Sequence, residues 1–322
     1  MLTSSDKYIV RIMLRNKMLS SDGSVFECLF SDIMSKYNPK FEQVKPYGNV
    51  GDRKNDGFDK TVGEYYQVFA PENSEKQTTI GKAVEKLDED FNGLYEYWNE
   101  LCPIKKYNFV INDKYKGAPQ PLHQKMLELE KAYPEITFNI LTVNKLEDYF
   151  LSLSEDDVIA IVGCIADPAL QLDYSALTEA LNHLMNIKGN IERSDLKNVP
   201  DFEEKIRFNG LSAQAADLLR SASYQVGSLE LYFKRNSEFA RSDIQKRITD
   251  CYLNACTAVE PNEEGYSDLV FFQLLEDVSP GSTYAVKSAT LVLLSYYFET
   301  CDIFERPKKD EENDSAKETL TD

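Results

Sequence analysis

The arrangement of apolar positions changes about halfway along the chain. Up to residue 165, short apolar runs alternate with amphipathic stretches, whereas from about residue 168 apolar residues recur almost throughout at helical spacing. Alternating strands and helices are typical of α/β domains, and a succession of helices is typical of all-α domains. The pattern therefore predicts an α/β domain with a mixed central sheet over residues 1–165, followed by an all-α domain over residues 166–306.

The first half is predicted to contain both helices and strands. Ile80, Val84 and Leu87 recur at helical spacing, whereas residues 64–69 have strong β propensity. Polar residues at 20–23 are suited to cap a helix that contains the next apolar stripe. This capped helix lies within residues 18–36, the other predicted helices are 78–100, 120–132 and 145–153, and the predicted strands are 54–59, 64–69, 107–111 and 136–143.

The second half is predicted to contain helices separated by Asn, Gly and Pro residues. They are 173–187, 201–207, 212–236, 240–258, 266–277 and 283–298. Residues 307–322 are polar and acidic, and Leu320 is their only large apolar group. Such a segment cannot bury enough apolar surface to fold, so a disordered tail is predicted there.

Composition excludes several classes of function. The 322 residues are enough for two domains, and no apolar run approaches the roughly 20 residues that span a bilayer. The chain has two histidines, and its six cysteines form no CxxC pair, which argues against zinc catalysis and His-based triads. The first residues lack a signal-peptide pattern, so we expect a cytoplasmic protein with no membrane partner.

The charge is acidic overall but unevenly distributed. A net charge of −18 argues against a protein that coats nucleic acid, because phosphate contacts need Lys and Arg. Residues 1–60, however, carry a net charge of +2. We expect any DNA-facing surface in this segment, and the alternative is that its charges are simply solvated.

One short region contains a candidate metal site. If the first two predicted strands form an antiparallel hairpin, Asp56 lies opposite Gln67, and Lys54 lies opposite Phe69. A carboxylate beside a carboxamide offers the oxygen ligands that Mg²⁺ or Mn²⁺ prefers, and Glu27 of the preceding helix could reach the same place. The alternative is a plain turn, because Asn-Asp-Gly is a common turn sequence.

A second polar group follows the predicted strand 107–111. Asn112, Asp113 and Lys114 stand at the end of this strand, where the sites of α/β proteins tend to form. They also suit a plain turn, and the sequence leaves both interpretations open.

The candidate metal site resembles a motif of the PD-(D/E)XK restriction-endonuclease-like superfamily, especially its Mrr-type branch. That motif has a helix with Glu, then G-x-x-G-D-x-G-x-D, then a strand with Q-x-K. The matching residues here are Glu27, Gly48, Gly51, Asp52, Asp56 and Gln67. The resemblance implies that Asp56 is the principal metal ligand, that Gln67 takes the second ligand position, and that Glu27 helps through the metal or a water molecule. It also implies metal-dependent hydrolysis of DNA.

Two positions depart from that motif. Lys54 replaces the glycine of G-D-x-G, and Phe69 replaces the lysine of Q-x-K. That lysine normally orients the attacking water and stabilises charge on the phosphate, which a phenyl ring cannot do. Lys54, Lys82 or Lys86 could substitute for it, and loss of catalysis within a retained fold is the alternative.

Four stretches carry a second resemblance, to proteins of bacterial ABC three-component systems. They are residues 65–72, 109–117, 205–212 and 296–305. The resemblance implies that residues 166–306 are the C-terminal helical domain of such a protein. It also implies work beside an SMC-like ABC ATPase and a small third component, in defence against phage and other mobile DNA, and it leaves open a homo-oligomer through the helical domain. The chain has no P-loop motif, so it is not expected to be the ATPase.

Three functions follow from these patterns. The first is a nuclease-fold effector that cleaves DNA, with Asp56, Gln67 and Glu27 as metal ligands and Lys54 as a catalytic cation. The second is a catalytically degenerate adaptor of the same system that senses DNA or binds a partner, which the missing lysine and the acidic charge favour. The third is a purely structural subunit of the ATPase complex.

Overall fold

The computed structural model describes most of the chain. The described residues are 2–46, 51–72, 76–167, 169–187, 201–236, 238–300 and 303–304. The chain divides into two units, residues 1–163 and residues 164–322. The predicted tail at residues 307–322 and the motif residue Gly48 lie outside the described residues.

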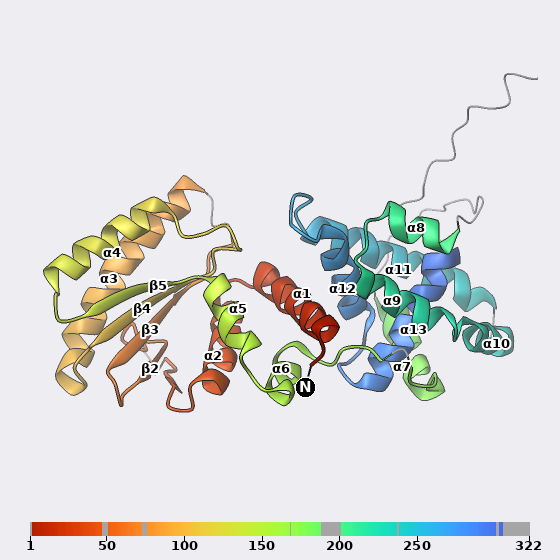
Figure 1. Ribbon diagram of the computed structural model, residues 1–322, viewed down its shortest axis with the longest axis horizontal. Helices are drawn as coiled ribbons and strands as arrows, with labels where there is room; N and C mark the ends of the chain where they lie inside the picture. The colour runs from red at the N-terminus through yellow and green to blue at the C-terminus, as the bar shows by residue number, and fades with distance from the viewer. Residues whose placement is uncertain are drawn as a thin grey trace, which may run out of the picture. The chain divides into compact units, whose positions relative to one another are not determined.

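A five-stranded mixed sheet forms the centre of the N-terminal unit (Figure 1). Its strands are β1 (Glu42–Gln43), β2 (Gly57–Asp59), β3 (Glu64–Phe69), β4 (Lys106–Ile111) and β5 (Thr137–Leu141). They lie side by side in sequence order. β1, β2 and β3 pair antiparallel, whereas β3, β4 and β5 pair parallel. The sheet therefore has the mixed character that the sequence predicts.

Helices cover both faces of this sheet (Figure 1). One face carries α3 (Gln77–Leu101) and α4 (Gln120–Ala132), and the other carries α2 (Gly23–Tyr37) and α5 (Val143–Leu151). Successive side chains of a strand point to opposite faces, so β3 contributes to both layers. The ring of Tyr65 lies 6.2 Å from that of Trp98 on α3, and the ring of Tyr66 lies 5.6 Å from that of Phe30 on α2.

Two helices of the N-terminal unit are missing from the sequence-based prediction. α1 (Ser4–Ser20) begins with a capping box, in which Thr3 Oγ1 accepts the backbone N–H of Asp6 at 3.1 Å. Ser154 directly precedes α6 (Glu155–Val162), and its hydroxyl caps the helix by accepting the N–H of Asp157. In α1 the basic residues obscure an apolar stripe that is buried in the structure, so charge alone was a poor guide to this segment. The stripe contains Ile9, Val10, Ile12, Leu14 and Met18.

Several predicted elements have different boundaries in the structure. The helix predicted after the capping residues 20–23 is α2, which begins at Gly23, and the chain is extended at Ser21 and Asp22 between α1 and α2. The helix predicted over residues 212–236 is broken by a turn after residue 223 into α9 (Ala213–Ser223) and α10 (Val226–Asn236). The strand predicted over residues 54–59 begins only at Gly57, the first residue of β2.

The second unit is helical, and its described residues contain no strand. Besides α9 and α10, its helices are α7 (Tyr174–Asn186), α8 (Phe202–Phe208), α11 (Glu238–Ala258), α12 (Tyr266–Val278) and α13 (Tyr284–Thr300). Residues 286–298 of α13 are all buried, as expected for a helix that packs on every side. None of the helices that the structure describes is long and apolar enough to cross a bilayer.

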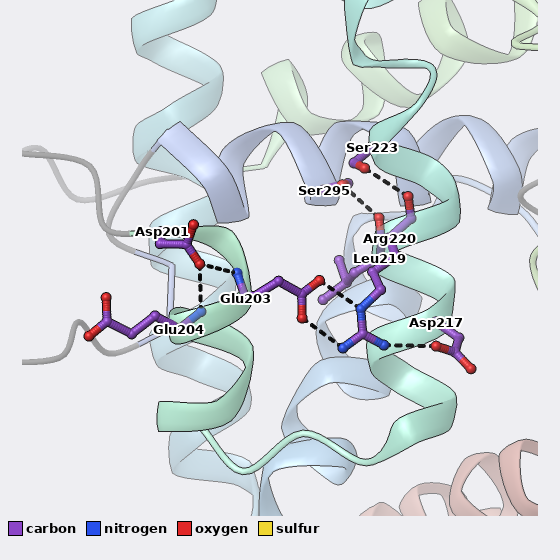
Figure 2. Close-up of polar contacts among 8 residues, drawn as sticks. All are labelled: Asp201, Glu203, Glu204, Asp217, Leu219, Arg220, Ser223 and Ser295. Atoms are coloured by element: carbon purple, nitrogen blue, oxygen red, sulfur yellow. Dashed lines mark hydrogen bonds and ion pairs between the residues drawn. The ribbon is translucent and has the colours of Figure 1, made fainter.

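Polar contacts join α8 and α9 at the surface of this unit (Figure 2). The carboxylate of Asp201 caps α8 by accepting the N–H groups of Glu203 and Glu204, both at 3.0 Å. Glu203 in turn accepts two hydrogen bonds from Arg220 of α9, at 2.7 and 2.8 Å. The same figure shows Ser295 of α13 donating to the Leu219 carbonyl of α9 at 3.0 Å. These bonds fix the short helix α8 beside the central helices.

Candidate active site

The predicted site residues lie around one pocket of the N-terminal unit. The pocket has a volume of about 730 Å³, and Glu27, Lys54, Asp56 and Gln67 all line it. Glu27 comes from α2, Gln67 from β3, and the other two from the loop before β2. The structure therefore brings together residues that the sequence places on three separate segments.

The hairpin has the predicted register from Gly57 to Asp59, and the predicted pair of Asp56 with Gln67 lies just beyond this ladder. Gly57 pairs with Tyr66 and Phe58 pairs with Tyr65, and the N–H of Asp56 donates to the Tyr66 carbonyl at 3.1 Å. The predicted pairing of Lys54 with Phe69 is wrong, however. Arg53 and Lys54 have left-handed φ angles of 57° and 66°, so the chain has already turned away from β3 at this point.

This turn determines the position of the Asp56 carboxylate. Since Lys54 does not extend the ladder, the N–H of Val68 donates instead to Asp56 Oδ2, at 2.6 Å. Asp56 is only 5% exposed. Burial raises its pKa to about 7, the Val68 hydrogen bond opposes this shift, and the charges of Glu27 and Asp52 add to it. A nearby cation would stabilise the charged form of such a buried carboxylate and lower its pKa.

Glu27 and Gln67 add two further oxygen donors. Burial raises the pKa of Glu27, with the charge of Asp52 contributing in the same direction. Gln67 Oε1 is buried and accepts no hydrogen bond. The described residues offer no cluster of three or more His, Cys, Asp or Glu side chains around a metal position. Two carboxylates, a carboxamide and water nevertheless suit Mg²⁺, which binds oxygen and usually retains several waters. The residues therefore fit the predicted ion.

Two lysines line the same pocket and share one buried partner. Lys54 Nζ lies 2.7 Å from Asp90 Oδ1, and Lys86 forms an ion pair with the other carboxylate oxygen of Asp90. Asp90, on α3, is 1% exposed, and Gly93 one turn later leaves room for Lys54, since a Cβ there would lie 3.2 Å from Lys54 Cγ. Asp90 escaped the sequence reasoning, although its four-residue spacing from Lys86 is a typical sign of an ion pair on a helix.

The structure distinguishes among the lysines that could replace the motif lysine. Lys54 and Lys86 line the pocket, whereas Lys82 is not among its described lining residues. Phe69 is half-buried, and its ring stacks on that of Phe109 at 6.0 Å. Phe69, which the resemblance places at the position of the motif lysine, therefore packs against the core between the sheet and the helices α3 and α4.

The second polar group of the sequence has a structural role. Asn112 Nδ2 donates to the carbonyls of Met18 and Ser21, at 2.9 and 2.8 Å, and Lys114 Nζ donates to the Leu19 carbonyl at 2.7 Å. These carbonyls belong to the C-terminal end of α1, which lacks intrahelical donors for them. Asp113 accepts the first N–H of α5, from Val143, at 3.0 Å. The group holds α1 and α5 at the end of β4, and no part of it lines the pocket.

The helical unit matches a known family of domains. Residues 175–305 match C-terminal domain 10 of the ABC-three component (ABC-3C) systems. The match confirms the predicted C-terminal domain, and it supports a place for the chain in an ABC-3C system. Comparison with curated proteins and with solved structures gives no match. The restriction-endonuclease-like assignment of the N-terminal unit stays a prediction.

Proposed function

We propose that the chain is the nuclease effector of an ABC-3C system and that its N-terminal unit hydrolyses phosphodiester bonds in DNA. One observation carries this proposal: Glu27, Asp56 and Gln67, which come from different elements, line one pocket together with Lys54 and Lys86. A plain Asn-Asp-Gly turn would explain Asp56 alone. It would not explain why α2 adds the carboxylate of Glu27, or why α3 brings the lysine Lys86 to the same pocket.

The proposed division of roles follows from the chemistry of these groups. Asp56, Gln67 and Glu27 would hold the metal ion, which when bound polarises a phosphate oxygen and lowers the pKa of a coordinated water. Lys54 and Lys86 would bind the phosphate and offset the charge that develops on it during hydrolysis. They would take over the role of the motif lysine that Phe69 replaces.

Asp90 would act on the two lysines rather than on the substrate. Its buried carboxylate forms ion pairs with both ammonium groups and so would hold each of them in a defined position beside the pocket. Fixed positive charges stabilise a transition state better than mobile ones, because they need no rearrangement during the reaction. Asp90 is therefore a positioning residue in this proposal.

The helical unit would supply the connection to the rest of the system. An ABC-3C domain over residues 175–305 supports a partner role, and the proposed partners are an SMC-like ABC ATPase and a small third component. A second copy of the chain is a further candidate partner for the helical unit. In this proposal the ATPase complex delivers DNA, and the N-terminal unit cuts it.

A second candidate function is a catalytically degenerate adaptor that senses DNA or binds a partner. Phe69 is the observation that favours it, because this ring is packed against Phe109 and cannot be exchanged for a charged group without disturbing the core. Asp90 also neutralises part of the charge of Lys54 and Lys86, which leaves less for a phosphate.

A cleavage assay with the partner components distinguishes the two functions. The chain is co-purified with the ATPase and the third component, and plasmid and linear DNA are incubated with Mg²⁺ or Mn²⁺ and ATP. The nuclease proposal predicts cleavage that Asp56→Asn abolishes and Lys86→Met reduces, whereas Lys82→Met leaves it unchanged. Cleavage at the wild-type rate in Asp56→Asn would refute the assignment. DNA binding without cleavage in the complete system would establish the adaptor.

A further inference from the structure

An aromatic ring and an unpaired guanidinium form the part of the pocket wall that the proposed hydrolysis does not use. Tyr97 of α3 is 44% exposed, and the guanidinium carbon of Arg53 lies 5.1 Å from the centre of its ring. Both residues line the pocket. Among the described residues, Arg53 has no ion-pair partner, and its contact with Tyr97 is a cation–π contact.

Neighbouring groups of the N-terminal unit contact both side chains of this arrangement or hold the elements that carry them. Trp98 packs edge-on against Tyr97, with ring centres 5.6 Å apart, and is itself half-buried against the sheet. Arg53 has a left-handed φ of 57°, and the next residue, Lys54, forms an ion pair with Asp90 of α3, so this loop lies beside the helix. An exposed ring held beside a free guanidinium offers a flat apolar surface and a phosphate-binding group at the same place.

The size of the pocket exceeds what a phosphate and a metal ion require. Its volume of about 730 Å³ falls within the roughly 300–1,000 Å³ typical of pockets that enclose drug-sized ligands. A base and a sugar therefore have room beside the phosphate. A base has a π-face whatever its identity, so aromatic side chains bind single strands by stacking with little sequence preference.

The charge of the pocket determines when an anion can enter it. Four carboxylates line the pocket, which are Glu27, Asp52, Asp56 and Glu96, and three cations face them, which are Arg53, Lys54 and Lys86. Asp90 adds a fifth carboxylate, because it forms ion pairs with both lysines. With all of these groups ionised, five negative and three positive charges leave a net negative charge, which a divalent ion would offset. Binding of a nucleotide should therefore depend on the divalent ion.

We propose that Tyr97 and Arg53 form a base-stacking subsite and that the pocket takes an unpaired nucleotide of single-stranded or frayed DNA. This inference rests on the proposed function, because the phosphate of the same nucleotide would lie at Lys54, Lys86 and the metal ligands. In an intact duplex each base is paired and stacked on its neighbours, so its face is closed to Tyr97. The subsite therefore selects DNA whose strands have separated.

The test is a binding measurement on the full chain with Ca²⁺, a hard ion that takes the same oxygen ligands. A fluorescent single strand and the blunt duplex of the same sequence are titrated with protein, followed by anisotropy. Variants are Tyr97→Leu, Tyr97→Phe and Arg53→Ala. The matched control is Tyr224→Leu, which makes the same change at a 90% exposed tyrosine of the other unit.

We expect the single strand to bind more tightly than the duplex and only with the divalent ion. Tyr97→Leu should weaken single-strand binding about tenfold, the effect expected from the loss of one base–aromatic stack. Tyr97→Phe keeps the ring and should bind nearly as wild type, Arg53→Ala should weaken binding, and Tyr224→Leu should change nothing. Equal or tighter binding of the duplex, wild-type affinity in Tyr97→Leu, or no oligonucleotide binding at all would overturn the inference.

Calorimetric titration of Mg²⁺ into the wild type, Tyr97→Leu and Asp56→Ala separates this inference from the proposed function. Tyr97→Leu should bind Mg²⁺ as wild type does, because the residue is no ligand. Mg²⁺ binding that requires Asp56, together with unchanged single-strand binding in Tyr97→Leu, would overturn the subsite alone. Mg²⁺ binding that is absent, or that persists in Asp56→Ala, would overturn the proposed function.

Discussion

Asp56 carries a charge that its surroundings oppose. It is almost fully buried, and the charges of Glu27 and Asp52 raise its pKa further, while Lys86 and the Val68 N–H lower it. The balance is a pKa of about 7, far above the ordinary value of 3.8. Such a site is costly to keep for stability alone, which is why a perturbed carboxylate in a pocket indicates function.

The first prediction concerns the pH dependence of stability in the presence of a chelator. The unfolded chain loses the Asp56 proton near pH 4, and the folded chain loses it near pH 7. Between these values the folded state binds more protons, so the free energy of unfolding should fall as pH rises and level off above pH 7. The contribution amounts to at most about 4 kcal/mol. Urea unfolding from pH 5 to 8 should show about 2.5 kcal/mol of this change. Asp56→Asn should remove it, and the same pH slope in both proteins would contradict this account.

The second prediction concerns the left-handed backbone at Lys54. A non-glycine residue in this conformation is strained by roughly 1 kcal/mol, and glycine is not. Lys54→Gly and Lys54→Ala both lose the ion pair with Asp90, so Lys54→Gly should be the more stable by about 1 kcal/mol. Lys86 lies in α3, and there the order should reverse, with Lys86→Ala more stable than Lys86→Gly by a similar amount. Urea unfolding of the four variants checks both orders. A lower free energy of unfolding for Lys54→Gly than for Lys54→Ala would show that the backbone at position 54 is not left-handed.

At the scale of elements, α1 depends on a loop that is distant in sequence. Asn112 is fully buried, and its amide donates to two carbonyls at the end of this helix. Lys114 donates to a third, and burial lowers the pKa of its ammonium group. The loop after β4 thus acts as the C-terminal cap that the sequence of α1 lacks, since Ser21 follows it where glycine is common.

The third prediction tests this cap. Asn112→Asp keeps the shape of the side chain but turns a carboxylate towards two carbonyl oxygens. We expect a loss of about 3 kcal/mol in the free energy of unfolding and faster amide exchange in the last turn of α1. The matched control is Asn92→Asp on the exposed side of α3, which should change stability by less than about 0.5 kcal/mol. Equal effects of the two substitutions would show that the cap contributes nothing.

The fourth prediction concerns the packing of α12 against α13 in the helical unit. Lys287 of α13 is 2% exposed and forms an ion pair with Glu276 of α12. Lys287→Met should be nearly neutral, because an apolar side chain of similar size suits the buried position. Glu276→Gln leaves the buried ammonium group without its partner and should be less stable than Lys287→Met by about 2 kcal/mol. Thermal unfolding of the two variants decides the order, and the reverse order would show that the pair is effectively solvated.

Amphipathic period and turn chemistry predict most elements of both units, but they miss features that depend on distant contacts. The pairing of β2 with β3 follows from the hairpin alone, and the structure has the predicted register from Gly57 to Asp59. The hydrogen bond from Gly23 to Ala70 and the ion pair of Lys54 with Asp90 join segments that are distant in sequence. Neither partner is recognisable from local sequence. The same is true of Tyr97, whose position beside Arg53 depends on the fold of the whole unit.

At the scale of the whole molecule, the two units carry different kinds of evidence. Residues 175–305 match an ABC-3C C-terminal domain, and this match supports a place for the chain in an ABC-3C system. In the proposed function the N-terminal unit contributes the chemistry, through the carboxylates, the carboxamide, the two lysines and the exposed tyrosine that line one pocket. The proposal joins these into an effector that cuts DNA under the control of its partners.

The central claim is that Asp56, Gln67 and Glu27 bind a divalent ion, and calorimetric titration of Mg²⁺ and Mn²⁺ into the full chain tests it most directly. The account predicts one site per chain in wild type and none in Asp56→Ala. It predicts weaker binding in Gln67→Leu and Glu27→Gln, and unchanged binding in Lys82→Met. The measurement requires neither partner nor substrate. Divalent binding of equal strength in wild type and Asp56→Ala, or no binding in wild type, would contradict the account.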